Sequence, residues 1–243
     1  MEMLLGPHIG PMTTADLAAA YPWPAGRPWV RAMMVITLDG ASTGADGLSG
    51  SISSGADQQV FDQTRRLADV VLVGAETIRA ERYQPLIARP DSAAERSSLG
   101  LAAAPRLVIV SASLQLPWSE QVFASSTIRP LVVTVESCDS EALAKAHEHA
   151  DVFVLPGTRV DPVALLEHLR EMGLPHIVCE GGPHLLSDLA HANAIDEADI
   201  SIAPLIVGGG QKVTGTTMFE PDRFSLVHSI VEDGYVFNRY VTG

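Results

Sequence analysis

Short apolar runs that alternate with segments of helical character constrain the fold of this chain more than any other feature. We expect strands at residues 29–38, 70–73, 107–110, 131–135, 152–155 and 176–179. We expect helices at residues 57–68, 75–82, 140–150, 161–172 and 183–191. The run at 70–73 is apolar at every position, which is typical of a strand covered on both faces. This alternation predicts an α/β fold whose sheet is largely parallel in its middle.

The two ends of the chain follow other patterns. Residues 1–28 are rich in Pro, Gly and Ala, and we expect an N-terminal arm there with a short helix at 15–21. Residues 85–104 predict a surface loop. We expect antiparallel strands at residues 199–207, 224–230 and 235–241. The last two are expected to form a hairpin around Asp233-Gly234. Without an internal repeat, residues 29–243 are expected to form a single domain.

Charge and composition exclude several classes of protein. The chain has 16 Lys and Arg against 29 Asp and Glu, a net charge of −13, and lacks the basic stripe of a nucleic-acid or anionic-membrane partner. Its 47% of hydrophobic residues exclude disorder. Because neither a signal peptide nor an apolar run of about 18 residues is present, we expect a soluble cytoplasmic protein. Two cysteines without metal-ligand spacing predict free thiols and no metal site.

One strand-to-helix turn has the composition of an anion site. Glu180, Gly181, Gly182 and Pro183 follow the apolar run at 176–179. Paired glycines let the backbone approach a ligand closely, and Pro183 suits the first position of a helix. The free N–H groups of such a helix start can bind a phosphate or pyrophosphate. A tight turn without a ligand explains the same residues equally well.

Two further turns are weaker candidates. Residues 74–77 (GAET) join a buried strand to a helix, and residues 111–113 (SAS) end another apolar run. In open α/β sheets ligands bind at the carboxyl ends of strands, where both turns lie. A lone glycine is more often a simple turn, and two hydroxyls can cap a turn as well as bind phosphate. The chain has no G-x-G-x-x-G fingerprint and no Walker loop.

Three carboxylates are candidates for acid–base chemistry: Asp39, Asp57 and Glu81. Asp57 falls in the first turn of a predicted helix, where the helix dipole favours its ionised form. It can equally be an ordinary helix-start acid. Asp39 precedes a glycine after a strand, a common turn composition. The eight histidines form no metal-type or nucleophile-pairing pattern.

Five motifs occur in the order of a known family. They are VITLDG (35–40), SISS (51–54), VVLVGAETIRAERYQPL (70–86), VCEGGPHLL (178–186) and IAPLIVGGG (202–210). Together they resemble the reductase (C-terminal) domain of the riboflavin-biosynthesis deaminase–reductase family, whose fold is that of dihydrofolate reductase. The resemblance covers residue 29 to the C-terminus. The H-x-E…P-C-x-x-C signature of the zinc deaminase is absent, so we expect a stand-alone form.

The resemblance implies a fold, a cofactor and a reaction. The fold is a three-layer α/β/α arrangement with a mixed, mostly parallel sheet and a C-terminal antiparallel hairpin. The cofactor is NADPH, and the family forms homodimers. The reaction is that of a 5-amino-6-(5-phosphoribosylamino)uracil reductase, a hydride transfer to a ribosylaminopyrimidine or related heterocycle.

The resemblance also implies a set of cofactor-binding residues. They are Ile52 and Ser53 near the nicotinamide ring, Gly74, Thr77 and Leu185 along the cleft, Ser111 and Ser113 at the 2′-phosphate, and Glu180, Gly181 and Gly182 at the pyrophosphate. We expect a non-proline cis peptide between the two paired glycines, which this fold is known to contain. The implied substrate-binding residues are Asp57, Arg65 and Glu81.

Three departures from the family pattern bear on the substrate. SISS stands in place of W-I-T-S, so an aromatic wall is lost. Only Arg65 keeps a family arginine position on the following helix, where Gln58 and Gln63 replace others. Glu81 stands where the family has a substrate-contacting aspartate.

Asp57 adds a fourth departure. In the riboflavin reductases that this chain resembles, the matching position usually holds a small apolar residue. In the dihydrofolate reductases it holds an acid. A carboxylate can accept two hydrogen bonds from a ring N–H and an adjacent amine, as a pterin or a diaminopyrimidinone offers. A uracil suits it poorly, at a cost of about 1–3 kcal/mol for each mispaired buried group.

We therefore expect a pyrimidine reductase of the riboflavin type. Dihydrofolate reduction is the alternative within the enzyme class. An NADPH-binding protein without turnover is the alternative outside it, and the acid at position 57 argues against that.

Overall fold

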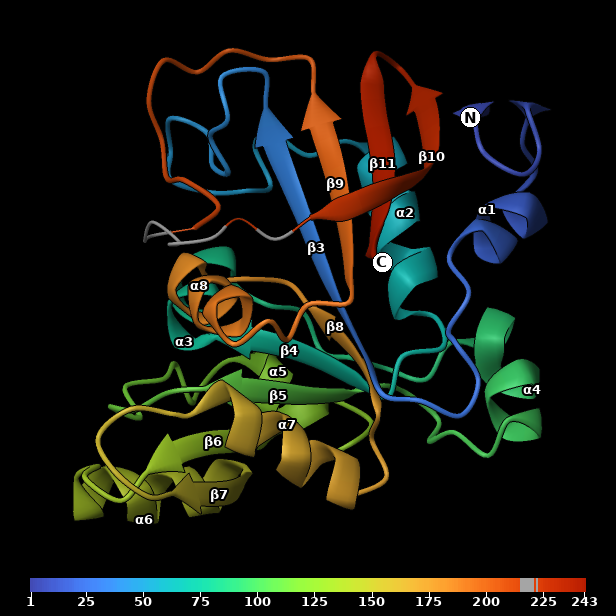
Figure 1. The fold of residues 1–243 in the computed structure, drawn as a ribbon. Helices are drawn as coiled ribbons and strands as arrows, with labels where there is room; N and C mark the ends of the chain where they lie inside the picture. Colours follow the sequence, from blue (N-terminus) through green and yellow to red (C-terminus); the bar gives the residue numbers. More distant parts are fainter. Residues whose placement is uncertain (215–220, 222) are drawn as a thin grey trace.

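The computed structural model describes residues 1–214, 221 and 223–243, and one twisted sheet runs through them (Figure 1). Its strands lie in the order β2-β1-β10-β11-β9-β3-β8-β4-β5-β6-β7. The strands are β1 (Glu2–Leu5), β2 (Gly10–Pro11), β3 (Trp29–Thr37), β4 (Val70–Gly74), β5 (Arg106–Val110), β6 (Leu131–Val135), β7 (Asp151–Leu155), β8 (His176–Cys179), β9 (Glu197–Ala203), β10 (Phe224–Glu232) and β11 (Tyr235–Thr242). The helices are α1 (Thr14–Ala20), α2 (Gly55–Arg65), α3 (Ala75–Glu81), α4 (Pro90–Ser98), α5 (Gln121–Ser125), α6 (Ser140–His149), α7 (Pro162–Glu171) and α8 (Pro183–His191).

The middle of the sheet is parallel, as the alternating pattern predicts. Parallel pairing continues through seven neighbouring strands, in the order β9, β3, β8, β4, β5, β6 and β7. Every position of β4 is buried, because helices cover both of its faces. The carboxyl ends of β4, β5 and β8 therefore meet at one edge of the sheet.

Helices lie on both faces of the sheet and make it the middle of three layers. Leu165 and Leu169 of α7 pack with α8 against one face, in a core with Val70 and Leu72. On the other face Val71 and its neighbours pack against α3, α5 and α6. Helices α1 and α2 extend this second layer over β3, β10 and β11. The predicted three-layer α/β/α fold is confirmed.

The antiparallel end of the sheet is larger than the sequence pattern indicates. The predicted hairpin is present, with Asp233 and Gly234 both at positive φ, 49° and 81°. The arm contributes two strands that were not predicted, and β1 pairs with β10. β9 ends at Ala203, short of the predicted residue 207, and pairs with β11 on one side and in parallel with β3 on the other.

Two short helices were also missed. Residues 85–104, predicted as loop, contain α4, which starts at a proline and buries Ser92 and Arg96 one turn apart. α5 lies between β5 and β6. No helix in the described part of the chain is long and apolar enough to cross a membrane.

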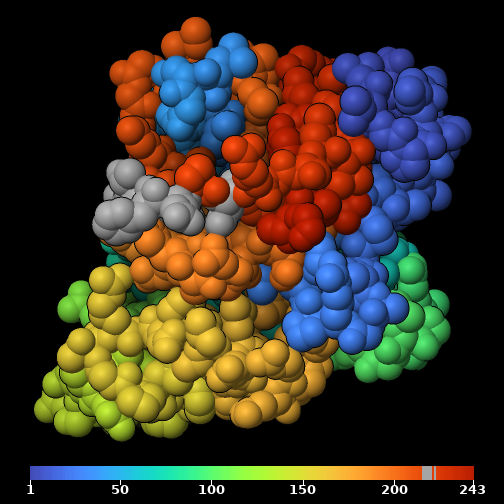
Figure 2. Space-filling view, in the orientation of Figure 1, coloured from blue at the N-terminus to red at the C-terminus, as the bar shows by residue number. Residues whose placement is uncertain are grey.

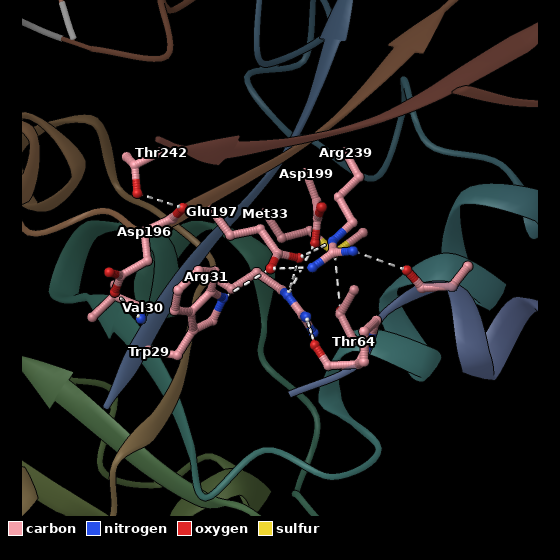
Figure 3. Close-up of polar contacts among 12 residues, drawn as sticks. Trp29, Val30, Arg31, Met33, Thr64, Asp196, Glu197, Asp199, Arg239 and Thr242 are labelled. Carbon is pink, nitrogen blue, oxygen red and sulfur yellow. Dashed lines mark hydrogen bonds and ion pairs between the residues drawn. The ribbon is translucent and has the colours of Figure 1, made fainter. Parts of the chain in front are cut away.

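A buried ion-pair network joins the arm to the sheet (Figure 3). Glu197 on β9 accepts hydrogen bonds from Arg31 Nε at 2.6 Å, Trp29 Nε1 at 2.8 Å and Arg239 Nε at 2.9 Å. Arg31 also donates to the carbonyl oxygen of Pro22 at 3.0 Å. The network therefore fixes the position of the arm relative to β3, β9 and β11.

Candidate active site

The two glycine turns predicted on separate strands lie against each other. The backbone N–H of Gly74, at the end of β4, donates to the carbonyl oxygen of Gly181, after β8, at 2.9 Å. Gly181 and Gly182 have φ values of 89° and 55°, which favour glycine. A Cβ on Gly182 would lie 3.3 Å from Oγ1 of Thr77. The peptide between the two glycines is trans, so the expected cis peptide is wrong.

A cavity of about 340 Å³ opens beside this junction, and we call it the cofactor cavity. Its lining includes five of the predicted cofactor residues, Gly74, Ser111, Ser113, Gly182 and Leu185. α8 begins here with Pro183 in its first turn, so the first N–H groups of the helix have no partner within it. Unpaired N–H groups and a glycine cradle fit a pyrophosphate.

Two arginines in the cofactor cavity were not predicted. Arg159 follows β7 and is 78% exposed at its side chain, with a contact of 3.1 Å to Asp188. Arg79 on α3 donates to the carbonyl oxygen of Gln115 at 2.9 Å. Ser111 Oγ accepts from the N–H of Leu114 at 3.0 Å. Arg159 could have been suspected, since it follows the carboxyl end of a predicted strand.

A second cavity, of about 500 Å³, lies on the other side of Thr77, and we call it the substrate cavity. It is lined by six predicted residues, Ser53, Asp57, Arg65, Thr77, Glu81 and Glu180, together with Val35, Ser49, Gly50, Gln58, Phe61, Asp62, Arg82, Tyr83 and Gln84. Thr77 is in contact with the glycine turn that borders the cofactor cavity. The two cavities are therefore neighbours, with Gly182 in the wall of one and Thr77 in the wall of the other.

Asp57 is the buried acid of the substrate cavity. It lies in the first turn of α2, whose N-cap is Ser54, and its residue surface is fully buried. Ser53 Oγ donates to Asp57 Oδ2 at 2.6 Å, whereas Oδ1 is buried without a hydrogen-bond partner of normal geometry in the described part of the chain. Burial raises the pKa of Asp57, and the hydroxyls of Ser201 and Ser53 lower it in part. The net direction is opposite to the one expected from the helix dipole, because loss of solvent outweighs it.

Glu180 faces the substrate cavity with two partners. Arg65 on α2 forms a two-point ion pair with the Glu180 carboxylate, and the Tyr83 hydroxyl donates to the same group. Burial lowers the pKa of Arg65, but the Glu180 carboxylate outweighs this and raises it. Glu180 was expected at the cofactor pyrophosphate, and Tyr83 was not predicted at all. Glu180 is instead part of the substrate cavity lining and holds Arg65 there.

The remaining predicted residues have structural partners. Glu81 Oε1 accepts the backbone N–H of Ser49 at 2.7 Å, so it holds the loop before α2. Asp39 accepts from Thr37 Oγ1 at 2.6 Å and from the N–H of Gly208 at 2.8 Å, and it lines neither cavity. Ile52 is buried, and its carbonyl oxygen accepts from the Tyr235 hydroxyl at 3.0 Å.

A small pocket of about 130 Å³ adjoins the substrate cavity through Asp62 and Arg65, and we call it the arginine pocket. Four arginines line it: Arg65, Arg66, Arg89 and Arg96. Arg96 is 2% exposed, donates to three backbone carbonyls and keeps a buried Nη2 without a partner in the described residues. The sequence did not indicate this cluster of arginines, because two of the four, Arg89 and Arg96, come from the segment predicted as loop, and three of the four are paired with carboxylates.

No group of three or more His, Cys, Asp or Glu among the described residues could hold a metal ion. Cys138 and Cys179 are free thiols, as predicted.

Comparison with known proteins matches residues 28–233 to the RibD C-terminal domain. A 2,5-diamino-6-ribosylamino-4(3H)-pyrimidinone 5′-phosphate reductase of Methanothermobacter thermautotrophicus is 33% identical over 184 residues, 75% of this chain and 81% of the relative. The enzyme of the same name from Archaeoglobus fulgidus is 26% identical over 88% of this chain and 99% of its own. A crystal structure of a pyrimidine reductase-like protein from Corynebacterium diphtheriae superposes with a TM-score of 0.84 and 26% identity, covering 95% and 98% of the two chains.

Proposed function

The chain belongs to the RibD C-terminal domain family, and on that premise we propose that it reduces a ribosylated diaminopyrimidinone phosphate with NADPH. It is an oxidoreductase of riboflavin biosynthesis, as its relatives are named. The finer proposal concerns the ring that it accepts. We propose the ring that still carries its 2-amino group, rather than the deaminated uracil.

The buried carboxylate of Asp57 is the observation that carries this choice. One of its oxygens is held by Ser53 and the other has no partner of normal geometry in the described part of the chain. A ring N–H beside an exocyclic amine supplies two donors side by side, which a carboxylate accepts together. On the corresponding edge a uracil has its N3–H between two carbonyl oxygens, so one of them would face the carboxylate without a hydrogen bond.

The arginine pocket supports a phosphorylated substrate. Asp57 and Arg65 are eight residues apart on α2, a rise of about 12 Å along the helix. A substrate that places its ring at Asp57 and extends along α2 would bring its phosphate to the arginine pocket. The unpartnered Nη2 of Arg96 is a donor there, and Arg89, which pairs with Asp62 and Asp91, adds a second positive charge.

NADPH would occupy the cofactor cavity, with its pyrophosphate at the glycine junction and the start of α8. Ser111, Ser113, Arg79 and Arg159 would hold the 2′-phosphate. When bound, the cofactor supplies the hydride. The chain's own residues bind and orient the substrate: Asp57 holds the ring, and the Glu180–Arg65–Tyr83 contacts fix the wall that faces it.

Reduction of dihydrofolate is a second candidate, because a pterin presents the same pair of donors to Asp57. A folate has no phosphate for the arginine pocket, which favours the pyrimidinone. The test measures NADPH oxidation with the diaminopyrimidinone phosphate, its deaminated form and dihydrofolate separately. We expect fastest turnover with the first. Turnover of dihydrofolate alone would replace this proposal with the second candidate, and turnover of none would refute both.

We also propose that the protein is a cytoplasmic homodimer. Leu4, Leu5 and Ile9, in and next to the outermost strands β1 and β2, are 53%, 47% and 70% exposed. Apolar side chains at an unpaired sheet edge suit pairing with a second copy. Light scattering should give twice the mass of the 25.8 kDa chain, and a monomer at micromolar concentration would contradict the dimer.

A further inference from the structure

The turn that follows β5 contains a strained residue, Leu114. Its φ of 56° lies in the left-handed region, which leucine rarely adopts. The same turn forms one wall of the cofactor cavity through Ser111, Ala112 and Ser113. The segments that line this cavity, green after β5, yellow before α7 and orange at α8, meet at the left edge of the molecule (Figure 2). Backbone strain of this kind is found mainly where a binding site requires a particular conformation.

The side chain of Leu114 holds the backbone in this conformation. It is 2% exposed and belongs to the core under α3, α5 and α6, together with Ile109 and Val122. The N–H of Leu114 donates to Ser111 Oγ at 3.0 Å, and its carbonyl oxygen accepts from the N–H of Leu116 at 2.9 Å. Because the buried side chain and these two bonds offset the strain, the turn has one fixed shape.

The turn in its left-handed shape fixes three groups that line the cofactor cavity. Ser111 Oγ is the acceptor of its bond from Leu114, so it keeps its own hydroxyl hydrogen for another acceptor. Ser113 Oγ accepts from the N–H of Gln115 at 3.4 Å. The carbonyl oxygen of Gln115 accepts from Arg79 Nη1 at 2.9 Å. These are three of the four groups proposed to hold the 2′-phosphate, and each is bonded to Leu114 or to the residue after it.

We propose that Leu114 is a positioning residue for the 2′-phosphate of the cofactor. Its buried side chain holds the left-handed turn, and the turn places two hydroxyls and a guanidinium along one wall of the cavity. Leu114 itself does not line the cavity, so it acts through its neighbours. The chain thereby distinguishes NADPH from NADH through a residue of the core. This role rests on the proposed function of the cofactor cavity and does not depend on which substrate is reduced.

Two substitutions separate this role from that of a leucine that only fills the core. In Leu114→Ala the Cβ still disfavours a positive φ, and no buried side chain remains to hold it, so the turn should change shape. In Leu114→Gly the cavity left in the core is at least as large, but glycine adopts a positive φ freely, so the turn should persist. If Leu114 only filled the core, the glycine substitution should be at least as harmful as the alanine one.

The experiment compares two probes that differ only in the 2′-phosphate. Calorimetric titration measures binding of adenosine 2′,5′-bisphosphate and of adenosine 5′-monophosphate to the full chain. We expect the unmodified chain to bind the bisphosphate about a hundredfold more tightly, as two charge-assisted hydrogen bonds would give. Leu114→Ala should lower this ratio about tenfold, the loss of one such bond, and Leu114→Gly should retain most of it. Affinity for the monophosphate should stay unchanged in both variants.

Leu116→Ala is the matched control, since Leu116 is buried in the same core and does not line the cavity, and its ratio should equal that of the unmodified chain. If Leu114→Ala does not fold, Leu114→Val decides the question. Valine keeps most of the volume, but its branched Cβ disfavours a positive φ, so this variant should also lose about tenfold of the ratio. An unchanged ratio in Leu114→Ala or Leu114→Val, equal losses in the glycine and alanine variants, or a loss in Leu116→Ala would overturn the proposal. Equal affinity of the unmodified chain for both probes would refute the assignment of the 2′-phosphate to this cavity, and the role of Leu114 with it.

Discussion

Ser53 donates its hydroxyl to Oδ2 of Asp57 at 2.6 Å, which links the loop before α2 to the buried acid of the substrate cavity. The family resemblance places Ser53 near the nicotinamide ring, so this bond would join the hydride donor's position to the group that holds the substrate ring. The other oxygen, Oδ1, has no hydrogen bond of normal geometry in the described part of the chain, although the Ser201 hydroxyl also lowers the pKa of Asp57. The proposed substrate preference rests on this buried carboxylate.

Asp57→Asn should lower kcat/KM for the diaminopyrimidinone phosphate by about a hundredfold. An amide replaces one acceptor with a donor, so two hydrogen bonds to the ring are weakened and one donor faces another. Cofactor affinity, measured by fluorescence titration of NADPH, should stay nearly unchanged. Asp39→Asn is the control, because Asp39 holds Gly208 and lines neither cavity. Asp39 becomes the stronger catalytic candidate if its variant loses activity and the Asp57 variant keeps it.

Arg159→Ala should raise the KM for NADPH about tenfold and leave the KM for NADH unchanged. Arg159 is exposed in the cofactor cavity, where a charge-assisted hydrogen bond to a phosphate is worth about 1.5 kcal/mol or more. Steady-state kinetics with both cofactors checks this. Arg129→Ala, which changes an arginine outside the cavity, should affect neither value. An equal rise in KM for the two cofactors would mean that Arg159 does not contact a 2′-phosphate.

Arg89→Gln should reduce the preference for a phosphorylated substrate over its dephosphorylated form by about tenfold. Arg89 lines the arginine pocket and pairs with Asp62 at 2.6 Å, so its loss removes a positive charge and leaves Asp62 unpaired beside the phosphate. The measurement is kcat/KM for both forms of the substrate. Adding Asp62→Asn to Arg89→Gln should restore part of the preference. Unchanged preference in both variants would place the phosphate elsewhere.

His228 should make the protein less stable as the pH falls. Burial, followed by the charge of Arg239, lowers the pKa of His228 to about 4, below its ordinary value of 6.5. Between these values the unfolded chain binds more protons than the folded one, so the free energy of unfolding decreases on acidification. Between pH 7 and pH 5 this amounts to about 2 kcal/mol.

The free energy of unfolding, measured with urea, should differ between pH 7 and pH 5. The His228→Leu substitution should reduce this difference by that amount. Replacement of an exposed histidine, His147→Leu, should leave the difference as it is. A His228 variant with the same pH dependence as the unmodified chain would show that this imidazole is not held neutral.

Periodicity made the parallel part of the sheet predictable, because most strands there contain a short apolar run and alternate with helical segments. It missed β1, since a strand of four residues at a sheet edge buries only Met3 and has no such run. It missed α4 because PDSAAERSS buries Ser92 and Arg96, polar residues that carry no apolar period. A periodic pattern of apolar residues indicates which face of an element is buried. β1 and α4 have no such pattern, because other contacts hold them in place.

The candidate site also has a part that the sequence predicts and a part that it does not. The glycines at 74, 181 and 182 were predictable because a tight turn or a close approach of the backbone requires glycine, which is visible in the sequence. The partners of Glu180, in contrast, come from α2 and from Tyr83 after α3, and their meeting depends on how these elements pack. The direction of the pKa shift at Asp57 was missed for the same reason, since burial is a tertiary property.

The ratio of kcat/KM values for the diaminopyrimidinone phosphate and its deaminated uracil form, measured with NADPH on the unmodified protein, tests the central claim most directly. One mispaired buried group and one lost hydrogen bond predict a ratio of about a hundred in favour of the diamino substrate. A ratio near one, or a preference for the uracil, would contradict the role assigned to Asp57.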